Sequence, residues 1–262
     1  KEDIIQLGTK NTEEEFSNDL ILFILEKLGG QRNDDDVSKS FVSKDAFVTQ
    51  MFNAMNMKTF DEKTFERISS AIDFTKQKKI QLGIVLGGGN IFRGRDLKDI
   101  KIDRVSADYI GMLSTIMNGI ALSNFLREKG HSNKLFSSFA IGNFVQAYNT
   151  EDALNALMNQ KVVLLVGGIG NPLFTTDSTA SIRANELEVD FMLKATNVNG
   201  VYDTDPKENP KAKKFENLTF DDAINQNLQV MDQTALCFCR DNNLQVRVFN
   251  ADEKDGFEKA IS

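Results

Sequence analysis

The sequence predicts an α/β fold built around a mainly parallel sheet. From about residue 60 onward, short runs rich in β-branched residues alternate with longer segments of helical periodicity, which is typical of βαβ units. Three of the strand-like runs lead directly into loops rich in glycine or hydroxyl groups. Because ligands of open α/β sheets bind at the carboxyl ends of the strands, we expect these three loops to meet at one edge of the sheet.

The N-terminal part of the chain is organised differently. Residues 1–7 form a candidate strand, and Thr12 with Glu15 then forms a capping box for a predicted helix that runs to about Leu28. The apolar run LILFIL, residues 20–25, makes this helix apolar on more than one side. Such a helix either presents a surface to a partner or is clamped between this domain and the next helix, and the sequence favours neither alternative.

An acidic segment separates this helix from a second predicted helix, which Ser43 begins and whose apolar side runs to Met55. The segment, Asp34 to Asp45, has oxygen-bearing side chains at the first, third, fifth, seventh and twelfth positions of an EF-hand loop. Lys39 stands where such a loop needs glycine, and Asp45 is shorter than the usual bidentate glutamate. A solvated acidic loop is therefore the default interpretation, and calcium binding is the alternative.

The elements after residue 60 follow from hydrophobic periodicity and turn signals. In chain order, the predicted elements are a helix around Phe65–Lys79, a strand at Ile80–Leu86, a helix at Tyr109–Leu126, a strand at Lys161–Val166, a helix at Thr179–Leu187, and strands at Val189–Ala195 and Leu244–Phe249. The first of these helices ends in a basic run, which suits the negative end of a helix dipole.

Composition argues against several classes of function. The net charge is −7, whereas a surface that follows a nucleic-acid backbone needs a basic excess. The longest apolar run, residues 20–25, is too short to span a bilayer. Cys237 and Cys239 lie in a predicted helix with side chains pointing apart, so neither a disulfide nor a zinc site is expected. The lone His131 is expected at the surface, in a helix-to-strand loop.

The segment GGGNIFRG, Gly87–Gly94, directly follows a predicted strand, and its composition fits either a phosphate loop or a tight strand-to-helix turn. Glycines let successive backbone N–H groups approach an anion, and Arg93 adds a bidentate cation for its oxygens. Asp108 begins the next long helix, where a carboxylate suits the helix dipole and can accept hydrogen bonds from sugar hydroxyls. Thr175 and Thr176 precede another helix and form a second anion cradle with its first N–H groups.

Five longer motifs resemble those of the bacterial-type UMP kinases, of the amino-acid kinase superfamily. They are GGGNIFRG, RVSADYIGMLSTIMNG, GNPLFTTDSTASIRA, LKATNVNGVYDTDP and VMDQTALCFCRDNNLQVRVFN, and the resemblance extends over roughly residues 60–251. The resemblance implies a single domain over residues 1–262, a three-layer sandwich with a mainly parallel sheet between two helical layers. It also implies transfer of the γ-phosphoryl group of ATP to UMP with Mg²⁺, in pyrimidine nucleotide synthesis, and commonly a hexamer. No Walker motif of the P-loop kinases is present.

The resemblance also implies which residues bind each substrate. For UMP they are Gly88, Asp108, Gly170, Asn171, Pro172, Leu173, Phe174, Thr175 and Thr176. For ATP they are Gly8, Thr9, Gly89, Arg93, Thr196, Tyr202 and Asp205. The catalytic group comprises Arg93, Asp205, Asp232 and Gln6, and no metal site of the protein's own is expected. This division suits phosphoryl transfer, which depends mainly on positioning and on stabilising charge.

The start of the chain departs from the family pattern. In the family, the first strand ends in Lys-Leu-Ser-Gly-Glu, and its lysine stabilises the transferring phosphoryl group. Residues 1–7 are the only candidate for that strand, which aligns Gln6 with the lysine, Gly8 with the serine and Thr9 with the glycine. Gln6 donates hydrogen bonds but carries no charge, and losing a preorganised charge at such a site costs orders of magnitude in rate.

Other differences accompany the loss of this lysine. Lys10 or Lys194 would have to replace its charge, and Ile169 stands where the family usually has a threonine on the UMP side. Residues 11–58 form an insertion, predicted to be helical, where the family has a short loop.

Two hypotheses about catalysis remain open. In the first, the chain is a working UMP kinase. In the second, it is a pseudoenzyme that serves a structural or nucleotide-sensing role, docked on a partner through the helices predicted in residues 12–57. The expected partners are UMP and ATP together with either further copies of the chain or a hetero-complex. The expected compartment is reducing, either the cytoplasm or the mitochondrial matrix.

Overall fold

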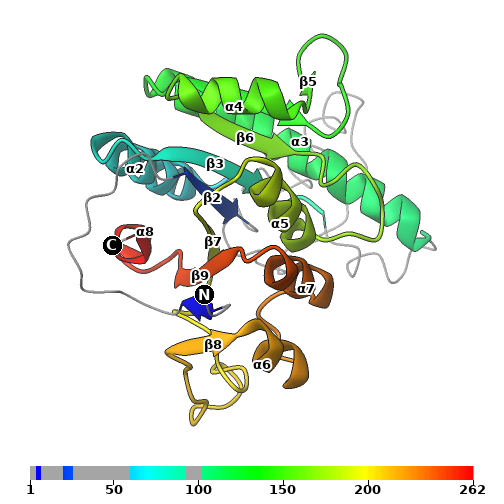
Figure 1. Ribbon diagram of the computed structural model, residues 1–262. Coiled ribbons are helices and arrows are strands. Elements are labelled where there is room, and N and C mark those ends of the chain that lie inside the picture. The colour runs from blue at the N-terminus through cyan, green and yellow to red at the C-terminus, as the bar shows by residue number, and fades with distance from the viewer. Residues whose placement is uncertain (1–3, 7–19, 26–59, 93–101, 262) are drawn as a thin grey trace, which may run out of the picture.

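The computed structural model describes residues 4–6, 20–25, 60–92 and 102–261 (Figure 1). Within them, nine strands form one sheet in the order β5-β4-β6-β3-β2-β7-β9-β1-β8. Every neighbouring pair is parallel except β1 with β8, which confirms the mainly parallel sheet. The strands are β1 (Ile4–Gln6), β2 (Leu20–Leu25), β3 (Gln81–Leu86), β4 (Asn133–Ser137), β5 (Gln146–Ala147), β6 (Val162–Val166), β7 (Phe191–Thr196), β8 (Asn217–Thr219) and β9 (Gln245–Asn250).

Helices cover both faces of this sheet (Figure 1). They are α2 (Glu62–Gln77), α3 (Arg104–Glu128), α4 (Thr150–Met158), α5 (Thr176–Glu186), α6 (Phe220–Asn225), α7 (Gln233–Asp241) and α8 (Gly256–Ile261). The core on one face is built with α2, α3 and α8, and the core on the other face with α4, α5, α6 and α7. The three-layer sandwich is therefore confirmed.

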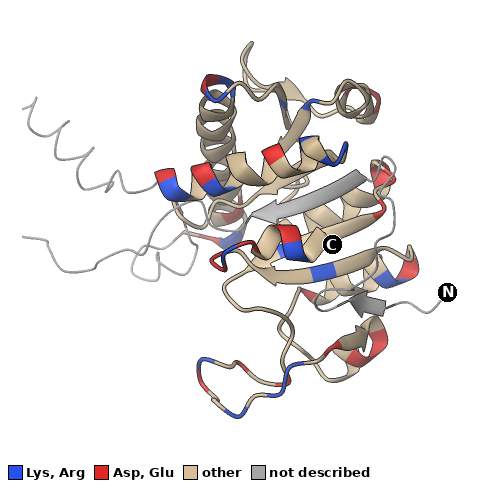
Figure 2. Cartoon of the chain, turned by 90° about the vertical axis from the view of Figure 1, so that its left-hand side faces the viewer, with Lys and Arg blue, Asp and Glu red and all other residues tan. Residues whose placement is uncertain are grey.

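Strand β6 shows why the central strands are apolar at every position. Val163 and Leu165 belong to the core beneath α4 to α7, whereas Val162, Leu164 and Val166 belong to the core beneath α2, α3 and α8. Because both faces of a parallel sheet are covered, the strand reads as a continuous apolar run rather than an alternating one. Figure 2 shows the same partition, with charged residues gathered on helices and loops and few of them on the strands.

The helix predicted from Thr12 to Leu28 is wrong at Leu20–Leu25, which form β2. β2 pairs along its whole length with β3 on one side and with β7 on the other, so it lies in the middle of the sheet. The physical reason is the one seen in β6, since a six-residue run that is apolar at every position fits a strand with a core on each face. A partner surface is not needed to explain it.

The insertion predicted as helical over residues 11–58 therefore contains a central strand. The capping box, the second helix from Ser43 and the acidic segment Asp34 to Asp45 lie outside the described residues. The strand predicted at residues 1–7 is confirmed at Ile4–Gln6, which form β1. However, β1 lies between β9 and β8, three places away from β2.

Helix α3 is the one helix of the described residues that is long and apolar enough to cross a membrane, with a mean hydropathy of 1.2 over 18 residues. Half of that window is buried inside the protein. Ile116, Leu122 and Leu126 are buried in the core that α3 shares with β6 and β3. The hydropathy of α3 is accordingly that of a core helix.

His131 lies in the expected loop between α3 and β4, but the expectation of a surface residue is wrong because it is only 4% exposed. Its Nε2 lies 2.8 Å from the hydroxyl of Ser69, and its Nδ1 lies 2.8 Å from the ammonium of Lys76. An ammonium only donates, so Nδ1 is the acceptor and the ring is neutral. Burial and the charge of Lys76 lower the pKa of His131, and the Asp73 carboxylate offsets part of that effect.

Lowering the pH from about 7.5 to about 5.5 is expected to destabilise the protein through His131. Because the pKa of His131 is lower in the fold than in the unfolded chain, the unfolded state takes up the proton first. Stability present above about pH 6.5 is then lost below it, by at most about 1.4 kcal/mol per pH unit. Urea unfolding at both pH values, on the native protein and on His131→Gln, measures the effect. An equal pH dependence in the two proteins would contradict this assignment.

Candidate functional site

The loops singled out in the sequence meet at one edge of the sheet, as expected. Because β3, β6, β7 and β9 run parallel with β2 among them, their carboxyl ends lie on the same side. Leu86 at the end of β3 is level with Leu25 at the end of β2, and Thr196 at the end of β7 is level with Asn250 at the end of β9. The loops that follow are residues 87–92, 167–175 and 197–205.

The first loop is held tightly against α3. A Cβ atom at Gly88 would lie 2.7 Å from the carbonyl oxygen of Gly111 and 2.8 Å from the Cβ of Ser114, so only glycine allows this approach. The fully buried amide of Asn118 donates to the carbonyl of Gly87 at 2.7 Å. These contacts fix the part of the loop in which backbone N–H groups were expected to face phosphate.

The second loop is tied to α3 at two points. The N–H of Gly167 donates to the hydroxyl of Thr115 at 2.7 Å, and the N–H of Leu173 donates to the Asp108 carboxylate at 2.8 Å. Gly167 and Gly170 have φ values of 77° and 87°, which glycine adopts without strain. The structure therefore brings together Asp108 and the loop that the resemblance assigns to the same nucleotide.

Two helices begin side by side at the end of this loop. Thr175 caps α5 and Asp232 caps α7, where its carboxylate accepts from the N–H of Ala235 at 3.0 Å. The same carboxylate accepts from the hydroxyl of Thr175 and, at 3.0 Å, from that of Ser178. The positive ends of both helix dipoles are thereby joined next to the loop, which favours an anion there.

A buried ion pair lies just behind these helix ends, and its cation is Lys194, one of the two lysines expected to replace the charge of the family lysine. The ammonium of Lys194, on β7, contacts both carboxylate oxygens of Asp177, on α5, at 2.6 and 2.5 Å. The two residues are 5% and 7% exposed. The available signal was the lysine itself, because a charge inside the apolar run FMLKAT requires a partner.

The third loop carries the residues that the resemblance assigns to ATP. The hydroxyl of Thr196 donates to the carbonyl of Val198 at 2.6 Å and accepts from its N–H at 3.1 Å, which turns the chain at the end of β7. The hydroxyl of Tyr202 donates to the side chain of Asn199. Asp205 is exposed and accepts from the backbone N–H two residues further on, at 2.8 Å.

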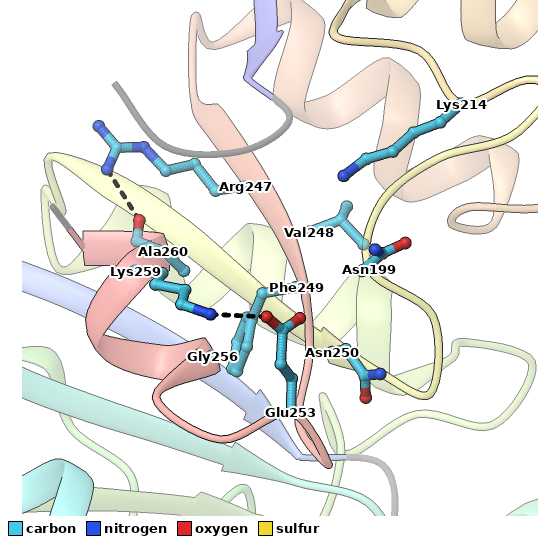
Figure 3. A pocket seen from close by; sticks show the side chains of 10 residues that line it. All are labelled: Asn199, Lys214, Arg247, Val248, Phe249, Asn250, Glu253, Gly256, Lys259 and Ala260. Carbon is cyan, nitrogen blue, oxygen red and sulfur yellow. Dashed lines mark hydrogen bonds and ion pairs between the residues drawn. The ribbon is translucent and has the colours of Figure 1, made fainter. Parts of the chain in front are cut away.

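A cavity of about 210 Å³ opens beside this loop (Figure 3). Its walls come from the loop after β7, from β9 and from α8, and Lys259 pairs with Glu253 across it at 2.7 Å. Its lining residues are Asn199, Lys214, Arg247, Val248, Phe249, Asn250, Glu253, Gly256, Lys259 and Ala260. Most of them fall within residues 247–260, and the folded chain adds Asn199 and Lys214 from the segment between β7 and β8, so no local pattern in the sequence indicates the cavity.

Three predicted site residues, Arg93, Gly8 and Thr9, lie outside the described residues. Gln6 is described, and β1 pairs it with Arg247 in the middle of β9, far along the sheet from β2 and β3. The premise that residues 1–7 are the only strand before residue 60 is therefore wrong. The remaining predicted residues lie in the loops described above or begin the helix that follows them, and are Gly89, Asn171, Pro172, Phe174 and Thr176.

This architecture, with three loops meeting at one edge of a sandwiched parallel sheet, has known counterparts. Residues 53–250 match the model of the amino acid kinase family, and the chain belongs to that family.

The similar proteins include several uridylate kinases. The uridylate kinase of Haemophilus influenzae (strain PittGG) is 41% identical over 202 residues, which cover 77% of this chain and 85% of that protein. The uridylate kinase of Alcanivorax borkumensis is 43% identical over 194 residues, covering 74% of this chain and 77% of that protein. The crystal structure of UMP kinase from Ureaplasma parvum superposes with a TM-score of 0.79 at 34% identity, over 94% of this chain and 95% of the other. The resemblance inferred from the motifs is confirmed.

Proposed function

We propose that this protein transfers the γ-phosphoryl group of ATP to UMP. The similarity to uridylate kinases supports this function, and so does the agreement of the fold with a UMP kinase structure. The observation that carries it is the junction of Asp108 with Leu173, because it joins a group suited to a ribose to a loop suited to a phosphate.

UMP would lie between the first two loops. Asp108 would accept hydrogen bonds from the ribose hydroxyls, while the backbone around Gly88 and the start of α5 would hold the phosphate. Phe174, which is 47% exposed at the end of the second loop, offers an aromatic face to the uracil. Asp232 already accepts hydrogen bonds from Thr175 and Ser178, which join α5 to α7, and caps its own helix through the N–H of Ala235. We therefore assign it a positioning role rather than contact with substrate.

ATP would lie against the third loop and the cavity of Figure 3, where Lys214 projects from the segment that follows Tyr202. Mg²⁺ would be bound with the nucleotide, because this ion takes most ligands from phosphates and water and only one or two from carboxylates. The donor set fits this arrangement. In the parts of the chain that are described, no cluster of three metal-ligating side chains exists, and the exposed Asp205 is the carboxylate that would join the phosphates. The ion neutralises charge on the phosphoryl oxygens when it is bound.

If β2, rather than β1, corresponds to the first strand of the family, the lysine of its Lys-Leu-Ser-Gly-Glu motif corresponds to Lys27. The sequence after β2 is Glu26-Lys27-Leu28-Gly29-Gly30-Gln31, which matches the order Lys-Leu-Ser-Gly-Glu with glycine for serine and glutamine for glutamate. β2 ends at Leu25, level with Leu86, and the glycine loop begins at the next residue of β3. We therefore assign to Lys27 the stabilisation of the transferring phosphoryl group, in place of Gln6.

This reassignment weakens the pseudoenzyme alternative, which rested on a missing lysine and on a helical insertion over residues 11–58, part of which is β2. Purified protein with ATP, Mg²⁺ and UMP, in an assay coupled to ADP release, tests the proposed function, with CMP and AMP as alternative acceptors. Turnover with UMP well above that with CMP or AMP is the expected result. Absence of turnover with all three nucleotides would favour the pseudoenzyme, and preference for another acceptor would contradict the assignment to UMP.

We further propose that copies of the chain associate through α3. Five apolar side chains spaced three or four residues apart form an exposed stripe along it, and they are Val105, Tyr109, Leu113, Met117 and Ile120. No charged residue lies between Asp108 and Arg127 on this helix. A continuous stripe of this kind is typical of a protein interface. The alternative, a hetero-complex docked through helices within residues 12–57, loses support because part of that segment is β2.

We propose a reducing compartment, either the cytoplasm or the mitochondrial matrix. Cys237 and Cys239 are free thiols on α7. Burial raises the pKa of Cys239 to about 12, so it stays protonated and unreactive at neutral pH.

A further inference from the structure

Arg183, on α5, is a buried arginine whose partner Ser138 contacts the second loop at Gly168. It is 7% exposed, and its guanidinium lies over the ring of Tyr148 with Cζ 3.7 Å from the ring centre. One nitrogen forms an ion pair with Glu186 at 2.6 Å, and another donates to the hydroxyl of Ser138 at 3.2 Å. A planar guanidinium held in three directions has a fixed orientation, so the N–H that reaches Ser138 is fixed too.

Ser138 connects Arg183 to the glycine turn that follows β6. Its backbone N–H donates to the carbonyl of Val166 at 3.1 Å, and its hydroxyl donates to the carbonyl of Gly168. A hydroxyl has one proton, and an arginine only donates, so Arg183 occupies an acceptor site and the proton is directed to Gly168. Gly170 packs directly above, where a Cβ atom would lie 3.2 Å from the Cβ of Ser138.

We propose that Arg183 is a positioning residue for the UMP-binding loop and acts through Ser138 rather than by touching the nucleotide. The inference rests on the proposed function, since the turn is part of the loop assigned to UMP. Gly167, Gly168 and Gly170 all have positive φ values, and glycine has many alternatives to any one conformation. The contacts from Arg183 to Ser138 and from Ser138 to Gly168 favour the single loop conformation in which the rest of the loop contacts α3.

Lysine cannot take the place of Arg183. A lysine ammonium lacks the planar fork that lies flat on Tyr148 while donating to Glu186 and Ser138 in different directions. Arg183→Lys therefore keeps the positive charge but loses the fixed orientation of the N–H groups that donate to Glu186 and Ser138. Ser138→Ala removes the hydroxyl at the middle of the contact, and Ser138→Thr restores a hydroxyl there.

Steady-state kinetics with UMP and ATP varied separately test the proposal. Arg183→Lys and Ser138→Ala are each expected to raise KM for UMP about tenfold, the effect of one lost hydrogen bond, with KM for ATP changed less than about twofold. The double variant should be no worse than either single variant, because both interrupt one chain of contacts. Ser138→Thr should recover most of the affinity. Arg240→Lys, which alters an arginine paired with Asp221 on the outside of α7, is the matched control and should leave both KM values unchanged.

Three results would overturn the proposal: equal rises in KM for UMP and ATP, loss of kcat with KM for UMP unchanged, or effects that multiply in the double variant. Failure of the proposed function is seen separately, as absence of UMP turnover in the native protein. In that event, amide hydrogen exchange decides the role of Arg183 without a substrate. Faster exchange at Gly167 and Leu173 in Arg183→Lys, but not in Arg240→Lys, supports the proposal, and unchanged exchange overturns it.

Discussion

Replacing Lys27 with alanine is expected to lower kcat for UMP phosphorylation by about a hundredfold to a thousandfold. The transferring phosphoryl group carries its charge on oxygens that move between the two nucleotides. Lys27, which follows β2 in the sequence, would stabilise that charge only while the group is in transit. For the same reason, KM for UMP should change by less than about threefold. Initial rates with saturating ATP and Mg²⁺ measure both quantities.

The matched control for this experiment is Gln6→Ala. Gln6 pairs in register with Arg247 in the middle of β9, and β1 is separated from β2 by two other strands. Its replacement should leave kcat within about twofold of the native value. If Gln6→Ala reduced kcat as strongly as Lys27→Ala, or if Lys27→Ala kept native turnover, the assignment of the lysine to β2 would be wrong.

The glycine loops could be predicted from the sequence, whereas β2 could not, and the reason is the kind of contact that determines each. The loop after β3 was predictable because Gly88 is required by a close approach that leaves a local pattern. LILFIL has no such local signature, since apolarity at every position fits both a fully covered helix and a central strand. Only pairing with β3 and β7, which are distant in sequence, distinguishes the two.

The same limit applies within the candidate site. Asp108, Thr175 and Asp232 were predicted from motifs, and the structure brings each into a contact at the ligand edge. Asp177 and Arg183 lie within one of those motifs, yet their roles depend on Lys194 on β7 and on Ser138 just after β4. Pairwise contacts between separate elements leave no periodicity or spacing in a single sequence, so reasoning from local patterns did not find them.

Replacing Asp177 with asparagine is expected to destabilise the protein by about 3–5 kcal/mol. The substitution keeps the size of the side chain but removes the negative charge that both oxygens present to Lys194 within a site less than a tenth exposed. A buried ammonium then loses its counter-charge without regaining water. Urea unfolding followed by circular dichroism measures the loss. Asp221→Asn, which breaks the exposed pair with Arg240, is the matched control and should cost less than about 1 kcal/mol.

The double variant Asp177→Asn with Lys194→Met separates stability from function at this pair. Removing both charges should recover most of the lost free energy of unfolding, because a buried ion pair contributes little beyond an apolar side chain of similar volume. Turnover should not recover, since the pair joins the first turn of α5, next to the proposed phosphate site, to β7, next to the loop assigned to ATP. Recovery of both stability and kcat would mean that the pair only fills the core. Recovery of stability alone would show that the ion pair supports turnover by positioning α5 relative to β7.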